Sequence, residues 1–402
     1  MLAAAACFLA MNRLIGVWAY LALRQEGSVS MELAQLLPSG EPYQVLLSLA
    51  YLLAFIMLFT MFNQHFQRFW WTRDVEKALV KLDRYAKQSK EILVKTVVER
   101  GKLDSDPSKM IDDFLEFFVI EPVDKDPFGV LKRLEHLLDL ERDQFRHFVA
   151  RVAPRADAVS AANLESLLAV AMALNLIYKI TRHYLILSKR TKSLLVLMQI
   201  AYSIPLILRI AEAYYNSLDA FSTGKPIGDS AGAMVAGRFM LGHPCVEVAE
   251  DVVASEVPFE GRTLVVLKAD GPGGKVGKPG DAVVNVLEKY RGSVARIIMV
   301  DAAAKLEGER SGQVAEGVGA AIGDPGPEKY KIEEEATKYR IPLDAIAIKE
   351  AIEEALSTMR KELVDGVEAA VERVKNIIRT RTKEGDVVVL AGIGNTIGVG
   401  NG

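Results

Sequence analysis

The chain has 402 residues, half of them (50%) hydrophobic, with a formal net charge of -3. This balance excludes the strong positive field by which many proteins bind nucleic acid. Two cysteines, Cys7 and Cys245, exclude a disulfide framework and a cysteine-based zinc site, and they fit a reducing compartment. The length is enough for two or three domains with their own cores. Abundant Lys and Glu with few Asn and Gln are typical of thermophilic proteins.

The clearest early feature is an apolar segment, Val45 to Phe62, which has no charge over 18 residues. About 20 such residues are needed to cross the hydrocarbon of a bilayer. Aromatic residues flank it, with Tyr43 before it and Trp70 and Trp71 after it, as in an interfacial belt. A buried core helix is the alternative, but the segment has no polar face. We therefore predict a transmembrane helix over residues 43–62.

The charges around this segment predict its orientation. Arg68, Arg73, Lys77 and Lys81 follow it, whereas Arg24 is the only basic residue between positions 24 and 42. Because positive charge gathers on the cytoplasmic side of spans, we expect a cell-membrane protein with most of its chain in the cytoplasm.

Residues 1–30 form a second apolar segment of a different kind. Asn12 and Arg13 lie in its middle, where a charge is costly in a membrane. It has no basic start, so a signal peptide is not expected. Two interpretations remain open: an imperfect second span, or a native chain that starts at Met31.

Residues 72–220 have the periodicity of helices and predict an all-helical domain. Asp74 to Arg100 has apolar residues near heptad spacing, which fits either an amphipathic helix on a bundle or a short coiled coil. Residues 161–184 and 192–215 predict a long antiparallel helix pair. The apolar run 194–208 is interpreted as a buried helix, with membrane contact as the alternative.

Residues 221–402 have a different pattern, in which short apolar runs alternate with helical stretches. This predicts a three-layer α/β domain with a mostly parallel sheet covered on both faces. Ligands bind such sheets outside the carboxyl ends of the strands. The expected strands are 263–269, 295–300, 345–348 and 386–391, and the expected helices are 230–241, 282–290, 328–339 and 350–380.

Two glycine-rich loops follow predicted strands. The first, Gly271 to Gly280, is not a Walker A loop, because Pro279 stands where Ser or Thr should hold magnesium. Anion binding by its backbone N–H groups and a mobile loop are the alternatives, and its candidate ligand residues are Gly273, Gly274 and Lys275. The second loop contains Gly394 and Asn395, and no helix follows it, so a dinucleotide site is not expected.

Two aspartates are the candidate catalytic residues. Asp229 follows Gly228 at the start of a predicted helix, and Asp301 ends a predicted strand. Two carboxylates that converge on one cleft can act as general acid and base or can hold a divalent metal. The structural alternatives are a helix N-cap for Asp229 and a loop-closing acceptor for Asp301.

The chain from about Met31 resembles an archaeal membrane-protein family catalogued only as a domain of unknown function, numbered fifteen-twelve. The resemblance rests on five stretches, and it brings no known activity. These are the FNQ-F-R residues at 62–68, IGDSAGAMVAGRFM at 227–240, GPGGKVGKPG at 271–280, VDAAAKLEGE from 300, and the final AGIGNTIG.

The C-terminal domain also resembles the spore germination protease and hydrogenase-maturation peptidase group, which has a phosphorylase/hydrolase-like α/β fold. The shared blocks are G-I-G-N at 392–395, GDSAG at 228–232, D-A at 301–302, the glycine segment 317–326, and I-P at 341–342. The resemblance implies that Asp229 and Asp301 are catalytic. The G-I-G-N block is last here but first in that group, which implies a circular permutation. The last strand would then lie beside the strand that ends at Asp301, with Asn395 near Asp229.

Three functions are compatible with these observations. The first is a membrane-anchored hydrolase of peptides or amides that uses Asp229 and Asp301, with or without a divalent metal. Ser230 as nucleophile is a weaker variant, because no histidine base lies near it in sequence. The second is a non-enzymatic protein that binds a small anionic ligand or a partner. The third is a scaffold or homo-oligomer built by the helical region.

Overall fold

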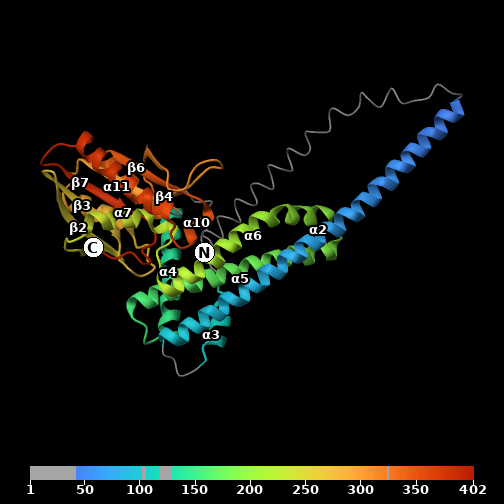
Figure 1. Ribbon diagram of the computed structural model, residues 1–402, viewed down its shortest axis with the longest axis horizontal. Helices are drawn as coiled ribbons and strands as arrows, with labels where there is room; N and C mark the ends of the chain where they lie inside the picture. Colours follow the sequence, from blue (N-terminus) through green and yellow to red (C-terminus); the bar gives the residue numbers. More distant parts are fainter. Residues whose placement is uncertain (1–41, 102–105, 118–128, 324–325) are drawn as a thin grey trace. The chain divides into compact units, whose positions relative to one another are not determined.

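The computed structural model describes residues 42–101, 106–117, 129–323 and 326–402. Long helices come first in this part of the chain, and an α/β domain follows (Figure 1). The apolar segment 1–30 lies outside the described residues. Two compact units are formed: residues 42–85 with 175–209, and residues 86–174 with 210–402.

The predicted membrane segment lies in helix α2, Pro42–Gly101. Its most apolar window has no buried residue, and Phe55 and Phe59 are exposed. Farther along, Val75, Leu82 and other residues near heptad spacing are buried, because this stretch packs against neighbouring helices. The single helix is therefore exposed and apolar at its start and amphipathic after it.

Two further helices among the described residues are long and apolar enough to cross a membrane: α5, Ala158–Thr191, and α6, Leu194–Thr223. They form the expected helix pair. The apolar window of α6 is only 22% buried. The interpretation of residues 194–208 as a buried helix is therefore wrong, because Leu195 and Tyr202 remain exposed on one side of this helix.

Two shorter elements complete the all-helical region: α3, Ser108–Phe114, and α4, Val130–Val152. The ring of Phe114 stacks on Phe148, with 4.1 Å between the ring centroids. The first half of α5 is buried, including Leu167 and Leu168. The all-helical prediction for this region is confirmed.

The α/β domain contains a seven-stranded sheet in the order β1-β2-β3-β7-β4-β6-β5. The inner strands β3, β7, β4 and β6 are parallel, whereas β1, β2 and β5 pair antiparallel. The prediction of a mostly parallel sheet is therefore wrong, because three unpredicted strands make the sheet mixed. The strands are Val246–Ala249, Val252–Phe259, Arg262–Ala269, Arg296–Ala304, Val314–Val318, Leu343–Glu350 and Val387–Gly392, from β1 to β7.

Helices cover both faces of this sheet. On one face, α7 (Ala231–Met240) and α11 (Lys361–Arg381) share an apolar core with Val266, Ile298 and Leu390. On the other face, α8 (Pro279–Lys289) and α9 (Pro327–Lys338) pack on the alternate residues of the same strands. The domain thus has the three layers that alternating strands and helices predict.

Candidate functional site

The candidate site lies where two glycine motifs, GDSAG (228–232) and G-I-G-N (392–395), meet beside the second half of β4 and the carboxyl end of β7. The short 3₁₀ turn η2, Gly228–Ser230, carries Asp229 and leads into α7. Strand β7 pairs with β4 in parallel, and the backbone N–H of Asn395 donates to Asp229 Oδ2 at 3.0 Å. The predicted position of the last strand and the predicted approach of Asn395 to Asp229 are both confirmed.

Glycines allow this close packing. A Cβ on Gly232 would overlap the carbonyl oxygens of Val300, within β4, and of Ile393, just after β7. Gly394 has a φ of +118°, and a Cβ there would overlap the carbonyl oxygen of Asp229. Because both motifs need glycine for backbone-to-backbone contact, they hold Asp229 at a fixed place beside the strand that carries Asp301.

We expect Gly394→Ala to destabilise the folded chain by about 2 kcal/mol or more. Alanine would be strained by the positive φ at this position, and its Cβ would overlap the carbonyl oxygen of Asp229. Chemical denaturation of the full-length protein in detergent would measure the change. Gly400→Ala is the matched control, since a Cβ at Gly400 meets nothing within 4 Å. Equal stability of the two variants would contradict this account of the packing.

Asp301 lies at the site in a buried position, with 8% of its surface exposed. Its Oδ1 accepts a hydrogen bond from the N–H of Ala302 at 2.8 Å, and its Oδ2 accepts one from Gly323 at 3.1 Å. Burial and then the charge of Asp229 raise the pKa of Asp301 to about 8, although both hydrogen bonds oppose the shift. Asp301 therefore holds its proton at neutral pH.

A third carboxyl group at the site, that of Glu350, was not predicted. The sequence pattern placed Glu350 at the start of a helix, but it is the last residue of β6, and the helices begin later, as α10 (Ile352–Leu356) and α11. It is 3% exposed, and its Oε2 has no hydrogen-bond partner among the described residues. Burial and then Asp229, Glu354 and Asp301 raise the pKa of Glu350 to about 8.

Gly228 makes room for this third group. A Cβ at position 228 would overlap Glu350 Oε2 and the carbonyl oxygen of Glu354. The same signal that pointed to Asp301, a carboxylate at the end of a buried strand, could have identified Glu350. Its neighbour Glu354 differs, because it receives hydrogen bonds from Ser311 and from the N–H of Ala351.

The electrostatics of the three groups are unusual. Burial raises the pKa of Asp229, and the hydrogen bond from Asn395 opposes this shift. Asp229 also keeps part of its surface in contact with solvent. Within the described ranges, no lysine or arginine forms an ion pair with Asp229, Asp301 or Glu350. Such a group holds protons near neutral pH and can donate or accept one.

The Gly271–Gly280 loop makes different contacts from those that were predicted. The N–H of Gly274 donates to Asn163 Oδ1 of α5 at 2.9 Å, and Thr396 Oγ1 donates to the carbonyl of Gly273 at 2.9 Å. Lys275 forms ion pairs with Asp270 and Asp251. The three candidate residues of this loop thus lie beside Thr396. The other predicted candidates, Gly228, Gly394 and Asn395, contact the group formed by Asp229, Asp301 and Glu350.

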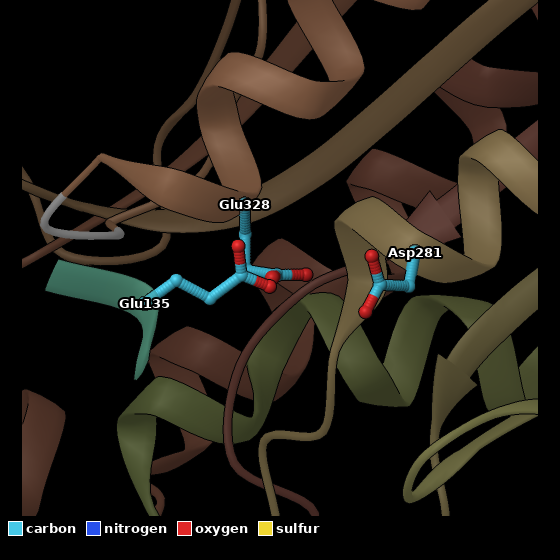
Figure 2. Close-up of side chains that lie close together, drawn as sticks. All are labelled: Glu135, Asp281 and Glu328. Atoms are coloured by element: carbon cyan, nitrogen blue, oxygen red, sulfur yellow. The ribbon is translucent and has the colours of Figure 1, made fainter. Parts of the chain in front are cut away.

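Figure 2 shows a second acidic group, Glu135, Asp281 and Glu328, whose oxygens lie within 4.8 Å of one another. Lys331 Nζ contacts these three carboxylates at 2.6, 2.6 and 3.0 Å, respectively. Burial would lower the pKa of Lys331, but its hydrogen bonds to the three acids raise it overall. A lysine ammonium therefore supplies the positive charge here, and the group ties α4 to α8 and α9.

We expect Lys331→Met to lower the free energy of unfolding by about 1–3 kcal/mol, because three partly buried carboxylates lose their counter-charge. The control is Lys329→Met on the same helix, where the ion pair with Glu333 is long, at 3.9 Å, and exposed. Chemical denaturation would compare them, and an equal loss in both variants would contradict the role of Lys331.

Comparisons with known proteins place this geometry in a family. The model described as "Protein of unknown function (DUF1512) N-terminal domain" matches residues 49–224. The model described as "Domain of unknown function (DUF1512) C-terminal" matches residues 227–400, which include η2, both glycine motifs and all three clustered carboxylates. No curated protein matches the chain. Because the two matches together span most of its length, the chain belongs to the DUF1512 family.

Proposed function

We propose that the chain is a membrane-anchored hydrolase of peptide or amide bonds, in which Asp301 is the general acid and Asp229 the general base. The observation that carries the proposal is the group formed by buried Asp301 and Glu350 and partly exposed Asp229, which no cation of the described residues neutralises. Buried carboxyl groups without a counter-charge destabilise a fold when they ionise. The presence of such groups near the carboxyl ends of parallel strands, where ligands bind, favours a functional role.

The roles follow from the surroundings of each group. Asp229 is partly exposed to solvent, whereas Asp301 and Glu350 are buried, so Asp229 is the carboxyl group best placed to contact and activate a water molecule. Asp301 is deeply buried and keeps its proton to about pH 8. In the proposed reaction, Asp229 takes a proton from a water molecule as the oxygen of that water bonds to the amide carbon. Asp301 gives its proton to the leaving nitrogen as the C–N bond breaks.

Two further arguments bear on the substrate and the place of action. The resemblance of the GDSAG, D-A and G-I-G-N blocks to the germination protease and maturation peptidase group supports a peptide or amide substrate and a phosphorylase/hydrolase-like fold. The exposed apolar start of α2 and the basic residues after it support an anchored protein whose α/β domain works in the cytoplasm.

A divalent metal is the alternative activator of water. The buried unpartnered Oε2 of Glu350 and an all-carboxylate donor set suit a hard cation held by Asp229, Asp301 and Glu350. Such an ion would lower the pKa of a bound water molecule. Among the described residues, however, the mutual approach of three acidic groups within 4.8 Å is found around Lys331 and not here. This favours acid–base chemistry without a metal.

The test is hydrolysis of a peptide library by the full-length protein in detergent, with added Mg²⁺ or Mn²⁺ and with a chelator. We expect cleavage that survives the chelator and is absent in the Asp229→Asn, Asp301→Asn double variant. Glu165→Gln is the matched control, because burial also raises the pKa of this carboxyl, which lies outside the cluster. Cleavage unchanged in the double variant would overturn the proposal, and a tightly bound ligand without any turnover would favour a binding protein.

A further inference from the structure

The hairpin between α5 and α6 has a basic tip. Helix α5 ends at Thr191 and α6 begins at Leu194. Lys189, Arg190 and Lys192 at this tip are all exposed to solvent. The tip is therefore a compact positive surface at one end of two long helices.

Contacts fix the tip against α2, just after the apolar segment. Arg68 donates to the carbonyl oxygen of Lys192 at 3.0 Å. Lys189 pairs with Glu76 at 2.5 Å. Along the chain, Arg68 follows the last residue of the apolar segment, Phe62, by six positions.

The rise per residue of an α-helix gives the distance of Arg68 from the end of the apolar segment. Six residues of α-helix span about 9 Å. The head-group layer on each side of a bilayer is roughly 5–8 Å thick, from the difference between the total and the hydrocarbon thickness. If residues 45–62 fill the hydrocarbon, Arg68 and the tip that it holds lie at the outer edge of the head-group layer, where long basic side chains reach the lipid phosphates.

The composition around the tip matches that level. Residues 63–77 and 188–193 contain six Lys or Arg and two Asp or Glu. Phe66, Phe69 and Trp70 are exposed on α2 beside these charges, as in the aromatic belt at a membrane surface. Basic residues at this position are attracted to anionic lipids.

The same contacts show which way the hairpin runs. Lys189 pairs with Glu76, and Tyr202 of α6 contacts Trp71, with 6.0 Å between the ring centroids. Glu76 and Trp71 both lie farther from Phe62 than Arg68 does. From its tip, the hairpin thus extends along the part of α2 that follows the apolar segment, away from the membrane.

We propose that the tip of the α5–α6 hairpin, residues 188–193, binds anionic phospholipid head groups, and that neither α5 nor α6 crosses the bilayer. Buried apolar residues of α6, such as Leu197 and Ile204, then serve the packing of the hairpin, whereas Leu195 and Tyr202 stay exposed. Lipid binding at the tip and the span of α2 together hold the helical region upright on one leaflet. This inference is independent of the proposed hydrolase activity.

The test is lipid quenching of a fluorophore on the full-length protein, reconstituted in phosphatidylcholine vesicles with or without phosphatidylglycerol. In a background with Cys7→Ser and Cys245→Ser, the label is placed at Thr191→Cys on the tip or at His183→Cys, about 12 Å away along α5. Nitroxide lipids carry the quencher either at the head group or deep in the acyl chain. Circular dichroism verifies that every variant keeps the helicity of the parent.

We expect head-group nitroxide to quench the label at 191 several-fold more strongly than deep nitroxide does, and several-fold more strongly than it quenches the label at 183. In vesicles with phosphatidylglycerol, the variant Lys189→Gln, Arg190→Gln, Lys192→Gln should lose most of the tip quenching. Quenching by deep nitroxide at both labels would show that the hairpin crosses the bilayer. The proposal would also be overturned if the label at 191 were not quenched, or if its quenching depended neither on phosphatidylglycerol nor on the three substitutions.

Discussion

Asp301→Asn is expected to stabilise the folded chain on the order of 5 kcal/mol at pH 8, and to have almost no effect near pH 4. The pKa of Asp301 is raised from 3.8 to about 8 in the folded protein. Between these values the folded state binds a proton that the unfolded state has lost, so wild-type stability falls as the pH rises. An uncharged asparagine removes that dependence, because it resembles the protonated carboxyl group.

The control for this prediction is Asp344→Asn, at another buried aspartate of the same sheet. Asp344 is paired with Arg296 at 2.7 Å and with Arg381 at 2.9 Å. Removing its charge leaves two arginines without their partner, so we expect a loss of stability there. Denaturation of both variants at several pH values would show the contrast, and a destabilised Asp301→Asn variant at pH 8 would contradict the account of Asp301.

The second large effect is expected on hydrolysis. Asp229→Asn should lower the rate of amide cleavage by about 10²–10⁴-fold, because the base that activates water is lost. In the wild type, cleavage should also decline as the pH rises through about 8, where Asp301 loses the proton that it donates. Initial rates on the best library peptide would measure both effects, and Glu165→Gln should keep the wild-type rate. A wild-type rate that is flat across this pH range would contradict the role of Asp301 as the acid.

Local patterns predicted the helical region and the four inner strands well, since these elements have long and regular apolar repeats. The same reasoning missed the antiparallel strands. The turn between β2 and β3 is Glu260-Gly261, with φ values of 45° and 78°. Such a hairpin turn usually contains Asn-Gly or Asp-Gly, so the Glu-Gly pair did not indicate a hairpin in the sequence. The short, exposed strand β5 carries still less signal.

The site was only partly predictable for a physical reason. Asp229 lies in a glycine motif and Asp301 follows a short apolar run, and those signals are local, although β4 continues past Asp301 to Ala304. Glu350 is followed by residues that favour a helix, and it reaches the site through the register of β6 on β4, where it pairs with Ala304. Lys331 likewise meets acids from two other helices. Contacts between distant segments of the chain leave no local pattern.

Infrared spectroscopy of the protonated carboxyl groups tests the central claim most directly, namely that Asp229, Asp301 and Glu350 form one coupled centre that holds protons near neutral pH. In the full-length protein we expect a carboxyl C=O band at neutral pH that disappears as the pH rises through about 8. This band should shrink in Asp301→Asn and in Glu350→Gln and should be unchanged in Asp344→Asn. Fully ionised carboxylates at neutral pH, or an identical band in all three variants, would contradict the account.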